Sequence, residues 1–407
     1  MLGGGDWLIG RDTRASGPSL VAALADGLTS AGADVVDLGV LPTPAVAFHS
    51  ALADVPAAVV SASHNPWTDN GIKLLGAGRK LSDSVEAAIA SRMDGPFAGG
   101  SAVGTVRAHP DPLADYAAHL VGTLGGRRLD GLVVVVDCAN GAASDVAPSV
   151  LRSLGASVSV LAAAPDGTNI NADCGSNHPA ALQAAVVAGG ASAGLAFDGD
   201  ADRVIAVAGD GTIVDGDSLI AICGADLDAR SLLRDHRVAV TVMSNLGLRR
   251  ALADLGIDVV ETAVGDRYVL EAMERDNLSL GGEQSGHVIF RDLATTGDGL
   301  LTGLQLLDVV VRSGQSLASL AASAMIRLPQ VLRAVRVADR DALAGSATVQ
   351  TAVEAATASL GGAGRVVLRP SGTEPLVRVM VEAVTEAEAV AVADRLVAVV
   401  TEALGSA

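Results

Sequence analysis

The chain contains few aromatic residues and few cysteines. Phe, Trp and Tyr together make up 2% of its 407 residues, so a core must be built from Ala, Val, Leu and Ile. The three cysteines, Cys138, Cys174 and Cys223, are not spaced as in a metal site, and so low a number is typical of a reducing compartment. No unbroken apolar run reaches the length of a membrane span, and no charged-then-apolar leader opens the sequence. We therefore expect a cytoplasmic protein with no membrane partner.

Basic residues, and lysine in particular, are also scarce. The net charge of −18 argues against nucleic acid as a partner, so an anionic substrate must be attracted by a local basic cluster. Only two of the 28 basic residues are lysines, Lys73 and Lys80. Arg stays protonated, whereas Lys can change its pKa and transfer a proton. Lys73 stands in Asn70-Gly-Ile-Lys73, ten residues after Ser63 of the second motif below, and is a candidate for proton transfer, although chance could also place it there.

The length of the chain indicates several domains, because one ordinary core does not grow to this size. Residues 28–35, 151–158 and 252–259 share one pattern, which predicts the end of a helix, a Gly stop and then a strand. Near-continuous apolar strands alternating with helices predict mainly parallel sheets covered on both faces. From about Leu332 the pattern changes to a smaller module of strands and helices. The alternative is that the repeats reflect only the local pattern that all α/β folds share.

The predicted fold class is therefore α/β: three related α/β domains with mainly parallel mixed sheets, followed by a C-terminal α+β domain. The expected boundaries are 1–115, 116–216, 217–329 and 330–407.

The most specific motif is Asp198-Gly-Asp-Ala-Asp-Arg203, which follows the apolar run 193–197. Carboxylates at every second position cannot form one face of a helix, so they are expected in a turn after a strand. Oxygen ligands clustered in this way suit a hard divalent ion, with Mg²⁺ first. An EF-hand would need Gly and Glu where Arg203 and Gly209 stand, so that class of site is excluded. The alternative is a solvated acidic turn.

A second motif, Ser61-Ala-Ser-His-Asn-Pro66, directly follows the apolar run 57–60. A hydroxyl at the end of a strand, here Ser63 beside His64, is where a nucleophile is often presented. No Gly-x-Ser-x-Gly elbow surrounds it, so an α/β-hydrolase is not expected. An ordinary turn serine is the alternative.

A third motif, Gly281-Gly-Glu-Gln-Ser-Gly-His287, places a carboxylate and a hydroxyl in a Gly-rich turn. Glu283 and Ser285 could hydrogen-bond vicinal sugar hydroxyls, because the carboxylate accepts and the serine does either. An ordinary tight turn between two strands is equally consistent with these residues.

The fourth motif, Arg369-Pro-Ser-Gly-Thr-Glu-Pro-Leu-Val-Arg378, combines fixed positive charge with hydroxyls and exposed backbone N–H groups. These groups form an anion cradle of the phosphate-binding kind, although not a Walker loop. A surface turn with solvated arginines is the alternative.

These four loops, in this order and at these spacings, resemble the α-D-phosphohexomutase superfamily. The similarity runs from about Ile9 to the C-terminus and includes Gly265-Asp-Arg-Tyr268 and Thr296-Gly-Asp-Gly299. The third and fourth motifs are most similar to the branch that acts on hexosamine phosphates. The resemblance implies an isomerase that converts glucosamine 6-phosphate to the 1-phosphate through a phosphoserine enzyme and a bisphosphate intermediate. Its product would supply amino-sugar nucleotides for cell-wall precursors.

The resemblance also implies a role for each matching residue. Ser63 would carry the phosphoryl group, with Lys73 as general acid/base and with His64 and Arg203 in support. Mg²⁺ would be held by Ser63, Asp198, Asp200 and Asp202. The sugar would be bound by Glu283, Ser285 and His287, and the phosphate that is not reacting by Arg369, Ser371, Gly372, Thr373 and Arg378.

The sequence departs from the family at its start. The family normally opens with a Phe-Gly-Thr-Asp-Gly-Ile-Arg-Gly-like segment, whereas this sequence begins a few residues before Arg11-Asp-Thr-Arg-Ala-Ser-Gly17. We expect that the natural start lies upstream of Met1. The alternatives are an impaired sugar-phosphate-binding protein, a mutase for mannose or glucose phosphates, and a metal-dependent phosphatase. A monomer or a homodimer is expected.

Overall fold

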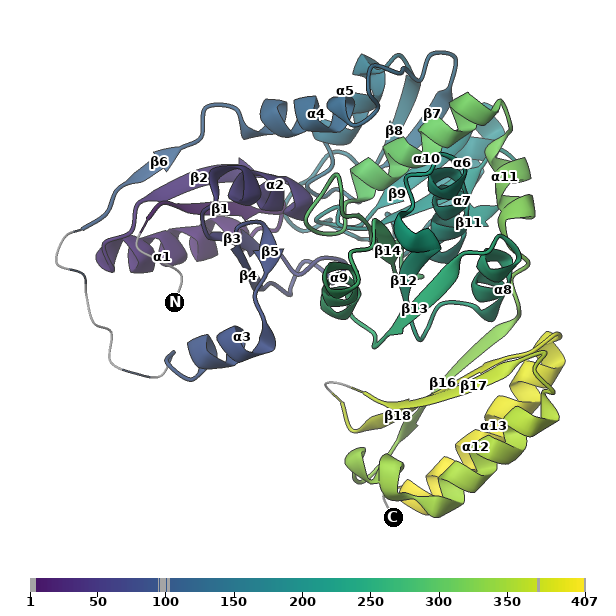
Figure 1. The fold of residues 1–407 in the computed structure, drawn as a ribbon. Helices are drawn as coiled ribbons and strands as arrows, with labels where there is room; N and C mark the ends of the chain where they lie inside the picture. Colours follow the sequence, from purple (N-terminus) through teal and green to yellow (C-terminus); the bar gives the residue numbers. More distant parts are fainter. Residues whose placement is uncertain (1–4, 94, 96–99, 101–102, 372–373, 406–407) are drawn as a thin grey trace. The chain divides into compact units, whose positions relative to one another are not determined.

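The computed structural model describes residues 5–93, 95, 100, 103–371 and 374–405. The chain divides into two units (Figure 1). The first comprises Met1–Thr241 and Gly256–Ala324, and the second comprises Val242–Leu255 and Met325–Ala407.

The first unit contains three mixed sheets. The first sheet has the order β5-β4-β3-β1-β2-β6, formed by β1 (Trp7–Arg11), β2 (Val35–Val40), β3 (Ala57–Val60), β4 (Ile72–Gly76), β5 (Arg79–Lys80) and β6 (Val106–Ala108). The second has the order β11-β10-β9-β7-β8, formed by β7 (Val133–Asp137), β8 (Ser157–Leu161), β9 (Ala193–Phe197), β10 (Val204–Ala208) and β11 (Ile213–Val214). The third has the order β13-β12-β14-β15, formed by β12 (Arg237–Thr241), β13 (Asp258–Thr262), β14 (Leu280–Gly282) and β15 (Val288–Phe290).

The three sheets share one topology. In each sheet the first strand lies between the second and third strands and is parallel to both, and the fourth strand is antiparallel to the third. The loop between the third and fourth strands therefore always starts at the carboxyl end of the parallel strands. In α/β sheets this edge is where ligands bind. These three loops carry three motifs of the sequence: residues 61–66 (the serine loop), 198–203 (the acidic loop) and 281–287 (the sugar motif).

Helices cover both faces of these sheets because side chains alternate along each strand. Trp7 and Ile9 of β1 pack against α1 (Gly17–Ser30), whereas a Cβ at Gly10 would meet Val46 of α2 (Thr43–Ala53) at 2.3 Å. In the second sheet, Ala196 faces α6 (Ala180–Gly189), and Leu195 faces α5 (Val146–Ser153) and α10 (Gly299–Ser313). The third sheet lies between α9 (Asp266–Arg275) and α7 (Gly216–Ala229). The remaining helices of this unit are α3 (Asp83–Ala90), α4 (Pro112–Gly122), η1 (Arg234–His236) and α11 (Leu317–Ala324).

The repeated helix–Gly–strand pattern has the conformation that the sequence predicts. Gly32, Gly155 and Gly256 have φ values of 90°, 95° and 73°, and a β-strand begins within three residues of each. Residues without a Cβ adopt this left-handed conformation readily, so the helix can stop and the chain can turn into the next strand.

The second unit is a separate α+β module. Its antiparallel sheet has the order β16-β18-β17, formed by β16 (Gln330–Arg336), β18 (Leu376–Glu382) and β17 (Arg365–Pro370). Its helices are α8 (Leu246–Asp254), η2 (Asp341–Gly345), α12 (Ala347–Ser359) and α13 (Glu386–Leu404). Val377 and Val379 of the central strand pack with Val392 and Leu396 of α13, which gives this unit its own core.

The predicted fold class is thus confirmed. In each of the three mixed sheets, the antiparallel pairings begin at the third strand and lie at one edge of the sheet. All three cysteines are free and buried. Within the residues that the structure describes, no helix is long and apolar enough to cross a bilayer.

Candidate active site

The serine loop and the acidic loop meet. Ser63 follows β3 and Asp198 follows β9, so both stand at the carboxyl ends of parallel strands. The Ser63 Oγ donates a hydrogen bond of 2.7 Å to Oδ2 of Asp198, although 135 residues separate the two. The Nδ1 atom of His64 lies 3.3 Å from the same hydroxyl. The hydroxyl that the sequence singles out is therefore in direct contact with the acidic cluster.

The three carboxylates of the acidic loop form a buried group. Asp198, Asp200 and Asp202 each offer an oxygen within 4.8 Å of the others, and their exposed fractions are 1%, 0% and 4%. Two turn contacts shape the loop: the backbone N–H of Arg203 donates to Oδ1 of Asp198 (3.1 Å), and that of Ala201 donates to the Asp198 carbonyl (3.0 Å). Among the residues that the structure describes, Oδ1 of Asp200 and Oδ1 of Asp202 are buried with no hydrogen-bond partner. Buried acceptors without a donor are rare in folded proteins, so these two oxygens are suited to bind a cation.

The pKa values of two carboxyl groups in the acidic loop shift in opposite directions. Burial raises the pKa of Asp198, and the nearby charges of Asp202 and Asp200 raise it further. Burial would also raise the pKa of Asp202, but Lys73, His287 and Arg203 lower it by more than burial raises it. Three carboxylates this close repel one another, and a divalent cation would relieve that repulsion. A hard ion that prefers oxygen ligands, such as Mg²⁺, fits this donor set.

Lys73 lies on β4, opposite Val59 of β3, and points to the acidic cluster. Its Nζ donates to Oδ2 of Asp200 at 2.6 Å and lies 3.7 Å from Oδ2 of Asp202. Burial lowers the pKa of Lys73, but the two carboxylates raise it by more, so the ammonium form is strongly favoured. Lys73 in this environment can neutralise negative charge and donate hydrogen bonds, and its raised pKa opposes release of the proton unless the charges around it change.

Arg203 and His64 complete the electropositive side. Nε of Arg203 lies 3.8 Å from Oδ1 of Asp202. Burial lowers the pKa of His64, and the positive charge of Arg203 lowers it further. His64 is therefore neutral at physiological pH and can exchange a proton with the adjacent hydroxyl.

The sugar motif forms the turn between β14 and β15, next to the acidic cluster. The backbone N–H of Val204 in β10 donates to the Gly286 carbonyl (3.1 Å), and a Cβ at Gly286 would lie only 2.1 Å from the Val204 carbonyl oxygen. His287 is 2% exposed, and its Nε2 lies 3.9 Å from Oδ2 of Asp202. Glu283 accepts a bond of 3.1 Å from the Gly265 backbone, and Ser285 is exposed. The structure thus brings the three predicted sugar-binding residues to one turn beside the carboxylates.

The motif of residues 369–378 (the arginine loop) lies in the second unit, at the hairpin between β17 and β18. Arg369 and Arg378 are directly opposite each other in the strand register. Like charges in such a pair repel, so this position favours an anion between or beside the guanidinium groups. Ser371 is 3% exposed, and its N–H donates to the Leu376 carbonyl (2.8 Å). Gly372 and Thr373, also predicted for this site, lie outside the described residues.

Comparison with known proteins agrees with this geometry. Residues 3–97, 114–211 and 215–328 match alpha/beta/alpha domains I, II and III of the phosphoglucomutase/phosphomannomutase family, and residues 332–399 match its C-terminal domain. The phosphoglucosamine mutase of Thermobifida fusca is 55% identical over 401 residues, which cover 98% of this chain and 89% of that protein. That of Frankia alni is 56% identical over 402 residues, which cover 98% of this chain and 88% of that protein.

The chain belongs to the phosphoglucosamine mutase family.

Solved structures share the fold of this chain. A phosphoglucomutase/phosphomannomutase family protein from Burkholderia thailandensis has a TM-score of 0.83 at 28% identity, covering 98% of this chain and 90% of that one. The N-acetylphosphoglucosamine mutase of Aspergillus fumigatus, in complex with GlcNAc-6P and magnesium, shares the fold. Its TM-score is 0.72 at 19% identity, over 89% of this chain and 93% of that one.

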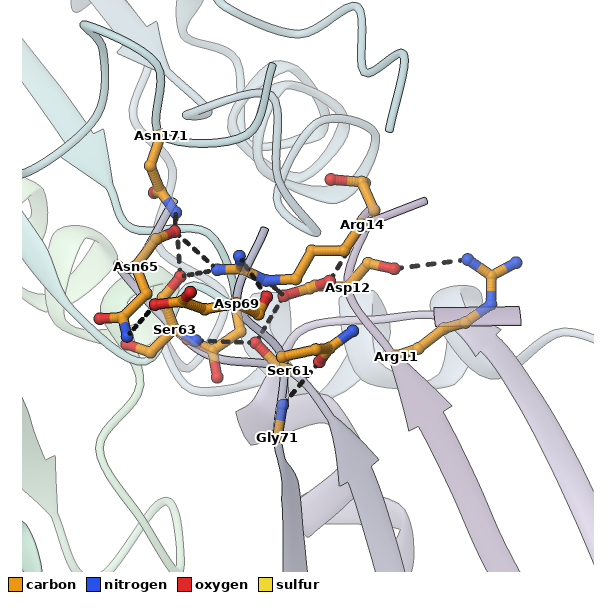
Figure 2. A network of polar contacts seen from close by, with 12 residues as sticks. Arg11, Asp12, Arg14, Ser61, Ser63, Asn65, Asp69, Gly71 and Asn171 are labelled. Atoms are coloured by element: carbon orange, nitrogen blue, oxygen red, sulfur yellow. Dashed lines mark hydrogen bonds and ion pairs between the residues drawn. The ribbon is translucent and has the colours of Figure 1, made fainter. Parts of the chain in front are cut away.

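The structure adds two residues to this phosphoglucosamine mutase family site that the sequence did not reveal. Arg14 and Asp12 form a buried ion pair of 2.9 Å directly behind the serine loop (Figure 2). In the sequence, their segment Arg11–Gly17 marks only the region where the likeness to the family begins. An acid and an Arg two residues apart after an apolar strand were a visible signal, but charged residues are usually exposed, so nothing in the sequence marked this pair as buried.

Two further motifs, residues 265–268 and 296–299, make contacts beside the site. Asp298 of the Thr296–Gly299 motif caps α10 through the Leu301 N–H (2.9 Å) and accepts the Tyr116 hydroxyl at 2.8 Å. Asp266 of the Gly265–Tyr268 motif pairs with Lys80 and lies 3.4 Å from Nε2 of His287. Both motifs therefore support the edges of the site.

Proposed function

We infer that this chain is a phosphoglucosamine mutase, which interconverts glucosamine 6-phosphate and glucosamine 1-phosphate. The observation that carries the inference is the 2.7 Å contact between the Ser63 hydroxyl and a buried group of three carboxylates. A phosphoserine enzyme needs positive charge beside the transferring group, and a divalent cation held by these carboxylates would supply it there. Two relatives that are named phosphoglucosamine mutase, at 54% and 56% identity, support the choice of sugar.

The proposed cycle has two balanced halves. In the first, the bond between Ser63 Oγ and phosphorus breaks while O1 of glucosamine 6-phosphate bonds to phosphorus, which gives a 1,6-bisphosphate. In the second, the bisphosphate has turned, its O6–phosphorus bond breaks, and Ser63 Oγ recovers a phosphoryl group. Each half moves one proton between a sugar hydroxyl and the serine oxygen. Protonated Lys73 and neutral His64 are the two groups that would carry it.

Two oxygens of the acidic loop that have no hydrogen-bond partner among the described residues support a metal site. Asp198, Asp200 and Asp202 would hold Mg²⁺ together with an oxygen on Ser63. Bound there, Mg²⁺ supplies positive charge that neutralises the oxygens of the transferring group. The magnesium in the Aspergillus fumigatus complex is consistent with this choice of metal.

The remaining predicted residues are assigned to the substrate. Glu283, Ser285 and His287 would bind the sugar hydroxyls. The paired arginines Arg369 and Arg378 would bind the phosphate that is not reacting, with Ser371, Gly372 and Thr373. The substrate is a phosphohexosamine. We also propose that the chain divides into four domains, with boundaries after residues 115, 216 and 329. We propose that the protein is a monomer or a homodimer.

The test combines mass measurement with turnover. Purified protein should carry one phosphoryl group on Ser63, and in a coupled assay it should turn over glucosamine 6-phosphate faster than mannose or glucose phosphates. Ser63→Ala should abolish the added mass and lower turnover by at least about 10³-fold, because the covalent route is lost. The matched control is Ser153→Ala, at the end of α5, whose hydroxyl donates to the Val150 carbonyl and whose loss should leave turnover unchanged. Wild-type turnover by Ser63→Ala would refute the mechanism, and faster turnover of another sugar would refute the substrate.

A further inference from the structure

The Arg14 side chain is fully buried, and four of its five hydrogen bonds go to one loop. It has 0% exposure and lies between β1 and α1. Its guanidinium donates to Oδ2 of Asp12 (2.9 Å) and to four backbone carbonyls, those of Ser63 (2.9 Å), Asn65 (2.8 Å), Pro66 and Asp69 (3.0 Å) (Figure 2). An Arg has five N–H donors, so all of them are used within the protein and none remains for a ligand. The loop that receives four of these bonds is the one that presents Ser63.

Ser63 itself has a backbone conformation that needs support. Its φ is +52°, in the left-handed region that residues other than Gly avoid. Such conformations persist where surrounding contacts hold them, and they occur most often at functional sites. The Ser63 carbonyl accepts two bonds, from Nη2 of Arg14 (2.9 Å) and from Nδ2 of Asn171 (3.0 Å). A Cβ at Gly199 would lie 2.6 Å from this same oxygen, so the acidic loop packs directly against the fixed carbonyl.

Asp12 connects the two sides of the loop. Its Oδ2 accepts from the Ser61 hydroxyl at 2.6 Å, and that hydroxyl accepts from the Ser63 N–H at 3.0 Å. Its Oδ1 accepts from the Arg14 N–H at 3.0 Å. Both the N–H and the carbonyl of Ser63 are therefore tied to one buried ion pair. A buried ion pair is weak evidence for stability, because desolvation opposes its formation, so the contacts of this pair with the Ser63 backbone indicate a positional role.

We propose that Arg14 is a positioning residue for phosphoryl transfer: locked by Asp12, it holds the main chain around Ser63 in the conformation that sets the Ser63 hydroxyl against the Asp198 carboxylate. The proposal rests on the proposed function. Because Arg14 has no donor left for substrate, its loss should lower kcat and leave KM close to the wild-type value.

The experiment compares Arg14→Lys and Arg14→Ala with the wild-type full-length protein. Lys keeps the charge but has three donors and no planar fork, so it cannot reproduce five directed bonds. We expect kcat to fall by about 100-fold for either variant, the scale of a small misplacement of a reacting group. Phosphorylation of Ser63 by glucose 1,6-bisphosphate, followed by intact mass, should slow to a similar extent. Added guanidinium should partly restore kcat in Arg14→Ala, whereas ammonium at equal ionic strength should not.

Two milder variants test the same idea if Arg14 variants do not fold. Asn171→Ala removes the bonds to the Ser63 and Asn65 carbonyls, and Ser61→Ala removes the bonds to the Ser63 N–H and to Asp12. Both leave the Arg14–Asp12 ion pair in place. Each should lower kcat by roughly tenfold, the scale of one lost positioning contact, with little change in KM.

The control is Arg127→Ala. Arg127 binds Asp308 through two bonds of 2.7 and 2.9 Å in the same unit, so its loss should lower Tm without changing kcat or KM. Wild-type kcat in folded Arg14, Asn171 and Ser61 variants would overturn the positioning role while the mutase assignment stands. A rise in KM with unchanged kcat would also overturn it. Failure of the wild-type protein to phosphorylate Ser63 or turn over substrate would instead overturn the proposed function.

Discussion

The serine loop and the arginine loop are both suited to phosphate, yet they are built differently. The serine loop is fixed by a fully buried Arg14 with five hydrogen bonds and by Asn171 from the second sheet's domain. The arginine loop is a hairpin between β17 and β18, and Arg340, which is about one-third exposed, donates to the Ser371 carbonyl at 2.6 Å. One loop is locked from within the core, and the other is held at the surface of its unit.

This difference matches what the two tasks require. Phosphoryl transfer slows by about 100-fold when the reacting atoms are misplaced by about 1 Å, so the serine loop must be held closely. Recognition of a phosphate needs charge and several donors, which tolerate small adjustments of position. We therefore expect damage near Ser63 to appear in kcat and damage near Arg369 to appear in KM.

The largest effect is expected from Asp200→Asn, which removes one charge from the acidic cluster. Oδ1 of Asp200 is unpartnered and Oδ2 pairs with Lys73, so the substitution weakens the metal site and frees the lysine. Turnover should fall at least about 10³-fold, because several kcal/mol of charge stabilisation are lost. The rise in Tm that Mg²⁺ gives the wild-type protein should also disappear. Asp210→Asn, in the exposed turn after β10, is the control, and an unchanged Mg²⁺ response in Asp200→Asn would contradict the metal site.

A smaller effect of a different kind is expected from Arg369→Ala. The loss of one charged phosphate contact, about 1.5–3 kcal/mol, should raise KM by roughly 10–100-fold and change kcat less. Relief of the repulsion with Arg378 should offset part of any stability that is lost with the contacts of Arg369. Arg333→Ala on the same sheet, paired with Asp394 at 3.6 Å, is the control for steady-state kinetics and thermal unfolding. A collapse of kcat with KM unchanged would show that the two loops work alike.

The smallest effect is expected from Arg340→Ala, the counterpart of the Arg14 variants. Arg340 makes one short bond to the loop backbone and is partly exposed, so about 1 kcal/mol should be lost, raising KM by roughly fivefold. Steady-state kinetics beside Arg14→Ala measure the contrast directly. Equal losses of kcat in the two variants would remove the distinction between a locked loop and an adjustable one.

Much of the fold was predictable because local pattern carries it. The apolar runs at 57–60 and 193–197 form strands with those bounds. Long apolar stretches between turn residues leave the backbone few alternatives. The shared order of strands in the three sheets was not visible in the same way, because pairing partners lie far apart in sequence.

The chemistry of the site was predictable in kind but not in geometry. Residue types alone indicated hydroxyl, carboxylate and guanidinium groups in loops after strands, and these are the groups that phosphate chemistry uses. Arg14 was missed because an Arg is normally solvated, and only packing shows that this one is not. Local sequence thus determined which functional groups exist and which strand ends carry them. The tertiary structure decided that Ser63 contacts Asp198, and it decided which carboxyl groups have shifted pKa values. It also decided that the Arg14 guanidinium is buried. These properties depend on burial and distance, which arise only when separate sheets pack together.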